Sequence, residues 1–128
     1  MKGDQVMIGL DLVEVERMKL ALERTPRFRD RVFTPIEIAY CETKKNPYPS
    51  YAVRFAAKEA FRKLHSSFSS GTRFHDVETV LDELGHPILV LHGNAKRLAQ
   101  ELEIDDIMVS TSHAGAYAAA ALVAVKRR

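Results

Sequence analysis

The sequence predicts an α+β domain, in which helices and antiparallel strands share one core. Three features indicate this class. An apolar, β-branched run lies near the start (VMIGLDLV, 6–13), a long helical pattern contains RFAAKEAFRKL (54–64), and two pairs of strand-like runs joined by turns follow. The 128 residues suit a single domain, 1–128, that buries most of the surface its unfolded chain exposes.

The first third of the chain is predicted to be one strand followed by helices. Residues 6–13 form the strand, and residues 15–23 have helical character. The Thr-Pro pairs at 25–26 and 34–35 each place a capping residue before a proline in the first turn of a helix. Glu37 completes a capping box with the second pair, which strengthens the prediction of a helix start there.

The segment before the long helix is predicted to be a loop. Residues 44–50, KKNPYPS, contain two prolines separated by one residue, which disfavours helix on both sides. Ser50 then caps the long helix. After that helix, residues 65–74 are rich in serine and glycine and predict a flexible loop.

The last part of the chain predicts two hairpins around a short helix. Residues 76–91 contain two β-type runs separated by a turn with Gly85 and Pro87. Asn94 can cap the short helix that follows. Residues 106–125 are rich in alanine, which favours helix by propensity, but the strand-like ends and a His-Ala-Gly-Ala turn predict a second hairpin.

Composition limits the classes of function. Hydrophobic residues make up 46% and charged residues 28%, as in soluble globular proteins, and no apolar run approaches the ~20 residues of a membrane span. The first residues hold an aspartate within the apolar stretch and no cleavage site, so no signal peptide is expected. A single cysteine, Cys41, cannot build a disulfide framework. These features predict a cytoplasmic protein with no membrane partner.

Positive charge is concentrated in residues 17–31, although the net charge is only +2. Such a cluster predicts one basic patch for one acidic partner. Two alternatives are a solvated helix face with a few ion pairs, and a small nucleic-acid-binding domain. Few aromatic residues beyond Phe28 and Phe33 accompany the arginines and the net charge is low, which argues against nucleic acid as the partner.

Two carboxylates lie where the pattern is otherwise apolar. Asp11 interrupts the predicted strand, and Glu59 occupies the face of the long helix that Phe55 and Ala56 share. An ionised carboxylate in such a place must be paired, protonated or bound to a cation. Two ordinary explanations stay open: Glu59 can pair with Lys63 one turn later, and Asp11 can cap the following helix.

Positive side chains accompany the acid of the long helix. Arg54, Lys58 and Arg62 recur every four residues and predict a positive edge beside it. Gly9, two residues before the acid of the strand, leaves room for another group to approach closely. Two carboxylates beside cations suit Mg²⁺ bridging to a phosphate, because Mg²⁺ takes few protein oxygens and completes its shell from substrate and water. The sequence has no P-loop and no GxGxxG, so neither a Walker nor a Rossmann site is expected.

Four segments together resemble one known family. They are IGLDLVEVERMKLALE (8–23), TPRFRDRVFTPIE (25–37), RFAAKEAF (54–61) and STSHAGAYAAA (110–120). Their order and spacing are similar to those of the holo-[acyl-carrier-protein] synthases, the small single-domain branch of the 4′-phosphopantetheinyl transferases. The resemblance covers nearly the whole chain, and it implies a small domain whose antiparallel sheet packs on a long helix.

The resemblance implies a Mg²⁺-dependent transfer of 4′-phosphopantetheine from coenzyme A to a serine of apo acyl carrier protein. Adenosine 3′,5′-bisphosphate would be the other product. In the family the aspartate of G-x-D and the glutamate of K-E-A hold the metal, here Asp11 and Glu59. Lys58 and Arg54 are then expected to contact phosphates of coenzyme A, and Lys58 to stabilise the departing bisphosphate. The base for the serine proton stays open between Glu59 and a water on the metal.

The resemblance also assigns further binding residues. Ser112 and His113 are expected near the ribose phosphate of coenzyme A, and the backbone of Gly85, His86 and Pro87 against its adenine.

Docking and assembly follow from the same resemblance. The carrier protein is expected to dock on Arg17, Arg24, Arg27 and Phe28, and the chain to form a homotrimer with coenzyme A in clefts between subunits. Residues 65–76 depart from the Gly-Thr-Gly pattern common in the family. A structural subunit that lost the chemistry is a further alternative, which the two intact acids and the K-E-A lysine argue against.

Overall fold

A three-stranded antiparallel sheet is the frame on which the helices pack. In the computed structural model, which describes residues 5–127, the central strand β5 (Tyr117–Lys126) pairs with β1 (Gln5–Glu14) on one side and β4 (Asp106–Ala114) on the other. The predicted domain, 1–128, includes residues 1–4 and 128, which lie outside this described part.

The remaining elements are a small hairpin and short helices around one long helix. The hairpin consists of β2 (Val77–Leu81) and β3 (Pro87–Leu91). The helices are α1 (Val15–Arg24), α2 (Phe28–Val32), α3 (Pro35–Cys41), α4 (Tyr48–Arg62), α5 (Ser66–Gly71), the 3-10 helix η1 (Phe74–Asp76) and α6 (Gly93–Glu101). This mixture of helices and antiparallel strands confirms the predicted α+β class. Along residues 5–127 no helix is both long and apolar enough to cross a membrane.

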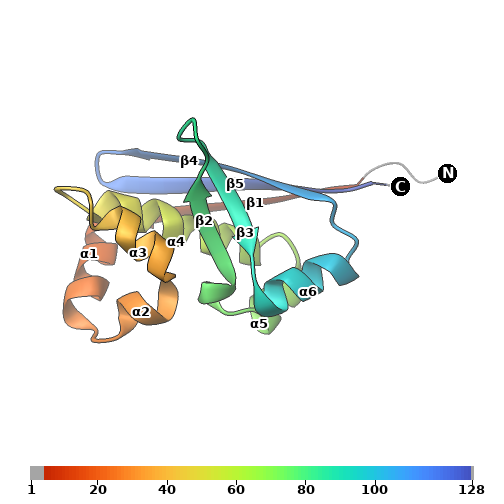
Figure 1. Ribbon diagram of the computed structural model, residues 1–128, viewed down its shortest axis with the longest axis horizontal. Helices are drawn as coiled ribbons and strands as arrows, with labels where there is room; N and C mark the ends of the chain where they lie inside the picture. The colour runs from red at the N-terminus through yellow and green to blue at the C-terminus, as the bar shows by residue number, and fades with distance from the viewer. Residues whose placement is uncertain (1–4, 128) are drawn as a thin grey trace.

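The helices lie on one side of the three-stranded sheet (Figure 1). The long helix α4 packs across β1 and β5. Alternate residues of β5 face this helix and are fully buried, and most of them are alanines. Because these side chains are short, the helix backbone lies close to the sheet. The core between the two layers is therefore thin at its centre.

Gly9 marks the closest approach of α4 to the sheet. A Cβ atom added at Gly9 would lie 2.0 Å from the backbone oxygen of Ala60 and 3.4 Å from Cδ2 of Leu64. The predicted close approach at Gly9 is thus made by the long helix of the same chain. It brings the strand that carries Asp11 against the helix that carries Glu59.

The other face of the sheet is apolar along β1 and has no covering element in the described residues. Val6, Ile8, Leu10 and Leu12 of β1 are 59–68% exposed, and Met108 of β4 is 50% exposed. In the strand register Ile8 is next to Val123, which in turn is next to Met108. These side chains form one continuous surface, which we call the open sheet face.

Several predicted elements are confirmed. The predicted strand 6–13 lies inside β1, and residues 15–23 lie inside α1. Thr34 and Glu37 form the predicted capping box at the start of α3. Both predicted hairpins are present, β2–β3 and β4–β5.

Two predicted helix starts are wrong. The Thr25-Pro26 pair does not begin a helix, because the backbone N–H of Thr25 donates to Ala21 and ends α1 instead. The next helix begins only at Phe28, after Arg27 in a left-handed conformation (φ 72°). Ser50 is not a cap either, because α4 begins two residues before it and Ser50 lies inside the helix.

Helix α4 begins at Tyr48 and contains Pro49 in its first turn. A proline in the first turn is tolerated because the N–H groups there have no partner within the helix.

Residues 65–74 are not a simple loop. They include α5, whose first turn is capped by the side chain of His65, which accepts from the N–H of Ser67. Phe68 is fully buried and stacks on Phe61 at a centroid distance of 4.2 Å. This one aromatic anchor outweighs the low helix propensity of serine and glycine.

The start of α6 also differs from the prediction. Its N-cap is His92 instead of Asn94, and the chain enters the helix through Gly93 at a φ of 51°. The side-chain oxygen of Asn94 accepts from Arg97.

We expect Gly9→Ala to destabilise the fold by about 1–3 kcal/mol, because the new methyl group meets backbone atoms that cannot rotate away. Elsewhere Gly→Ala at a compatible site stabilises a protein through the unfolded chain, so the sign of the effect is informative. Urea unfolding measures the change. An unchanged or higher stability would show that α4 and β1 are not in this tight contact.

Candidate active site

Asp11 is held on the helix-facing side of β1. Its side chain is 14% exposed, and its Oδ1 lies 2.8 Å from Nζ of Lys63, which also donates to the carbonyl of Leu10. The suggestion that Asp11 caps the following helix is wrong, because the N-cap of α1 is Glu14. Asp11 is therefore held beside α4 and leaves α1 uncapped.

Glu59 lies on the exposed flank of α4 and is about one-third exposed. Its recorded ion pair is with Nη1 of Arg62, at 3.9 Å. Lys63, the partner suggested by helix spacing, contacts Asp11 instead. The Glu59 carboxylate is thus close to solvent and held by one long contact.

The two acids line the same cavity, of about 350 Å³, between β1, α1 and α4, which we call the acid cavity. Phe55 forms part of its apolar wall. Arg17 and Phe28, two of the predicted docking residues, also line it. The strand and helix that contribute the acids are far apart in sequence, and the Gly9 contact brings them together.

This donor set suits an ion that needs few protein ligands. Within residues 5–127 no group of three or more His, Cys, Asp or Glu side chains could enclose a metal. Two carboxylates on a shared cavity match the usual protein contribution to a Mg²⁺ site, where phosphate and water complete the shell. Asp11 and Glu59 therefore fit the predicted metal.

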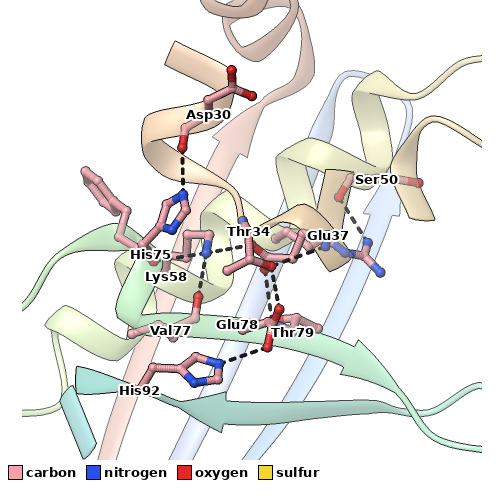
Figure 2. Close-up of polar contacts among 12 residues, drawn as sticks. Asp30, Thr34, Glu37, Ser50, Lys58, His75, Val77, Glu78, Thr79 and His92 are labelled. Carbon is pink, nitrogen blue, oxygen red and sulfur yellow. Dashed lines mark hydrogen bonds and ion pairs between the residues drawn. The ribbon is translucent and has the colours of Figure 1, made fainter. Parts of the chain in front are cut away.

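Lys58, which the resemblance placed at a phosphate, is only 1% exposed. Its Nζ lies 2.8 Å from Oε1 of Glu37 and donates to the carbonyls of Phe74 and Val77 (Figure 2). Burial lowers the pKa of the Lys58 ammonium, and the Glu37 carboxylate partly offsets this effect. All three N–H bonds of an ammonium thus have an acceptor inside the protein.

Arg54 is also buried, so the predicted positive edge of α4 is wrong. Its Nη1 donates to the carbonyl of Ser50, and its guanidinium lies 4.4 Å from the centre of the Tyr40 ring. Its Nε is buried without a hydrogen-bond partner. The helix turns Arg54 and Lys58 toward α3, and Arg62 alone of the three stays partly exposed.

The predicted docking residues lie around the break between α1 and α2. Arg24 ends α1 and Arg27 precedes α2, and both are exposed. Phe28 is half-buried and contacts Phe33 and Phe55, with ring centroids 6.5 and 6.3 Å apart. It also lines a second cavity of about 540 Å³, whose cations are Arg31, Arg62 and Arg73. Positive charge therefore surrounds an aromatic cluster next to the two acids.

The other predicted coenzyme A residues do not line the acid cavity. Gly85, His86 and Pro87 lie at the tip of the β2–β3 hairpin, where Oδ1 of Asp82 accepts from the N–H of His86. Ser112 and His113 are exposed near the end of β4. Within one chain the structure thus brings together the predicted metal ligands and two of the predicted docking residues, but leaves these two segments apart.

Sequence reasoning missed two residues. The sequence suggested Lys63 only as a partner of Glu59, but its long side chain reaches Asp11 and the carbonyl of Leu10 on β1. Glu37 was explained by its capping box alone, and no sequence signal showed that the same carboxylate binds Lys58.

Comparisons with known proteins identify the family. A family model described as the 4′-phosphopantetheinyl transferase superfamily (ACPS) matches residues 7–122. The holo-[acyl-carrier-protein] synthase of Geobacter sulfurreducens is 46% identical, covering 90% of this chain and 93% of its own. That of Moorella thermoacetica is 43% identical, covering 88% of each chain.

Solved structures agree. The ACPS–CoA complex of Chronobacterium ammoniagenes superimposes with a TM-score of 0.83 at 30% identity, covering 97% of this chain and 99% of its own. These matches favour a transferase over the nucleic-acid-binding alternative. The chain therefore belongs to the holo-[acyl-carrier-protein] synthase family of the 4′-phosphopantetheinyl transferase superfamily.

Proposed function

We propose that this protein transfers 4′-phosphopantetheine from coenzyme A to a serine of apo acyl carrier protein, in a reaction that depends on Mg²⁺. The observation that carries the proposal is the pairing of Asp11 and Glu59, from distant segments, on one cavity beside a basic and aromatic surface. The names of the relatives and the coenzyme A complex of a structural neighbour support it.

Asp11 and Glu59 would hold the metal. When bound there, Mg²⁺ would neutralise charge on the pyrophosphate of coenzyme A and orient it for in-line attack. The contact between Lys63 and Asp11 places one half-exposed ammonium beside the acid of the strand. That ammonium can approach a phosphate oxygen and stabilise charge that develops on the departing bisphosphate.

The reaction also requires a base. The serine oxygen attacks the β-phosphorus, the bond to the bisphosphate breaks, and the hydroxyl proton must be taken up. Glu59 lies near solvent on the shared cavity, so its carboxylate can accept that proton directly or through a water. The phosphate contacts predicted for Arg54 and Lys58 stay predictions.

The direct test is incubation with coenzyme A, Mg²⁺ and apo acyl carrier protein, with mass spectrometry of the carrier protein. We expect the added phosphopantetheine arm with the wild type, and a rate at least about a hundredfold lower with Asp11→Asn or Glu59→Gln. Glu101→Gln, at an exposed carboxylate of α6, is the matched control. Ordinary turnover in both site variants would remove the assignment of the metal ligands, and an inactive wild type would refute the function.

We also propose that the carrier protein docks across Arg17, Arg24, Arg27 and Phe28. The exposed arginines would steer an acidic surface toward the acid cavity, and the aromatic cluster around Phe28 would supply apolar contact. Arg17 lines the acid cavity itself, so a docked partner would lie next to the site of transfer.

Docking by charge predicts a strong effect of salt. We expect Arg24→Glu to raise the KM for the carrier protein about tenfold at low salt, with little change in the KM for coenzyme A. Added salt should raise the first KM in the wild type as well. Lys96→Glu, at an exposed cation of α6, is the control. A KM for carrier protein that is insensitive to both salt and Arg24→Glu would contradict this docking surface.

We further propose that the chain assembles as a homotrimer through the open sheet face, in the cytoplasm. The row of exposed apolar side chains on β1, continued by Met108 of β4, is unusual for a monomer. Assembly through it could bring Ser112 and His113, or the turn at residues 85–87, beside the acid cavity of a neighbouring subunit. This would explain why coenzyme A residues lie apart within one chain.

Light scattering after size-exclusion chromatography tests the assembly. We expect a mass of about three times the 14.4 kDa of the chain for the wild type. Ile8→Lys places a charge among the exposed apolar side chains of β1 and should give smaller species. Ile36→Lys, at a similarly exposed isoleucine of α3, should not. A wild type that runs as a monomer would refute the trimer.

A further inference from the structure

The Lys58–Glu37 ion pair is the most deeply buried pair of charges in the described residues. The exposed fractions of the two side chains are 1% and 0%. Glu37 also accepts from the N–H of Thr34 through Oε1 and from the N–H of Thr79 through Oε2, each at 3.0 Å. Both partners are therefore fully hydrogen-bonded, as a buried pair must be to persist.

The pair joins three elements at one point. Glu37 belongs to α3, Lys58 to α4, and Thr79 to β2, as Figure 2 shows. The ammonium also binds the carbonyl of Val77 in β2. One side of α4 is thus tied to α3 and to the β2–β3 hairpin by directional bonds.

The opposite side of α4 is fixed by shape. Ala60 presses its carbonyl against Gly9, so α4 cannot move closer to β1 or roll over it without a clash. Lys58, Glu59 and Ala60 are consecutive, and successive side chains of a helix point about 100° apart. Glu59 therefore projects between the side of α4 that Lys58 ties to α3 and β2 and the side that Ala60 packs against β1.

We propose that the Lys58–Glu37 pair is a positioning device, which sets the rotation of α4 and so places the Glu59 carboxylate opposite Asp11. Lys58 acts through Glu59 and makes no contact with coenzyme A. This inference rests on the proposed function, because Glu59 is taken as a metal ligand. It gives Lys58 a different role from the phosphate contact that the resemblance implies.

The two possible roles of Lys58 predict different changes in the affinity for metal and in the affinity for coenzyme A. If the pair positions Glu59, Lys58→Met and Glu37→Gln should both raise the Kd for Mn²⁺ about tenfold or more, as loss of an outer-shell partner does. Neither should change the Kd for coenzyme A measured in EDTA, where no metal takes part. If Lys58 binds a phosphate, Lys58→Met alone should weaken metal-free coenzyme A binding.

The double variant adds a second distinction. In Glu37→Gln/Lys58→Met no charge is left buried without a partner, so we expect it to fold even if Lys58→Met does not. Its Kd for Mn²⁺ and its kcat should be no worse than those of Lys58→Met, because both substitutions break the same device. Leu98→Ala removes a partly buried side chain of α6, a helix that packs on α5 and η1, and controls for lost stability alone, so its Kd for Mn²⁺ should equal that of the wild type.

Isothermal titration with Mn²⁺ and with coenzyme A, together with steady-state kinetics, decides between the positioning role and the phosphate contact of Lys58. An unchanged Kd for Mn²⁺ in Glu37→Gln would overturn the proposal, as would a loss of metal-free coenzyme A binding confined to variants without Lys58. A wild type that binds Mn²⁺ but does not modify apo carrier protein would instead count against the proposed function.

Discussion

The contact between Gly9 and Ala60 is the constraint on which the site depends. It lets the backbone of α4 lie directly against β1. Asp11 follows Gly9 by two residues on the strand, and Glu59 precedes Ala60 by one residue on the helix, so the contact brings both acids together. The short side chains of β5 extend the same close packing along the sheet. A larger residue at any of these points would separate the two carboxylates, so the site is a consequence of how the core is packed.

The charges of α4 are divided between two environments. Lys58 and Arg54 face α3, where Glu37, backbone carbonyls and the Tyr40 ring compensate them. Glu59 and Arg62 are partly exposed to solvent, and each lines a cavity at the surface of α4. Adjacent residues of one helix thus provide a member of a fully buried ion pair and a partly exposed acid.

The sequence predicted what periodicity and local chemistry determine. The alternation in residues 6–13, the capping box at Thr34 and the acids within apolar patterns all led to correct elements or to one shared cavity. Tertiary contacts decided the rest. The burial of Phe68 made a helix of a serine-rich segment, and the rotation of α4, which no local pattern specifies, turned Arg54 and Lys58 inward.

Anomalous diffraction from crystals grown with coenzyme A and Mn²⁺ would test the central claim most directly. The account predicts one manganese peak per chain, about 2.1 Å from an oxygen of Asp11 and an oxygen of Glu59, with phosphate oxygens as further ligands. A peak bound elsewhere, or two carboxylates that both point away from the bound diphosphate, would contradict it.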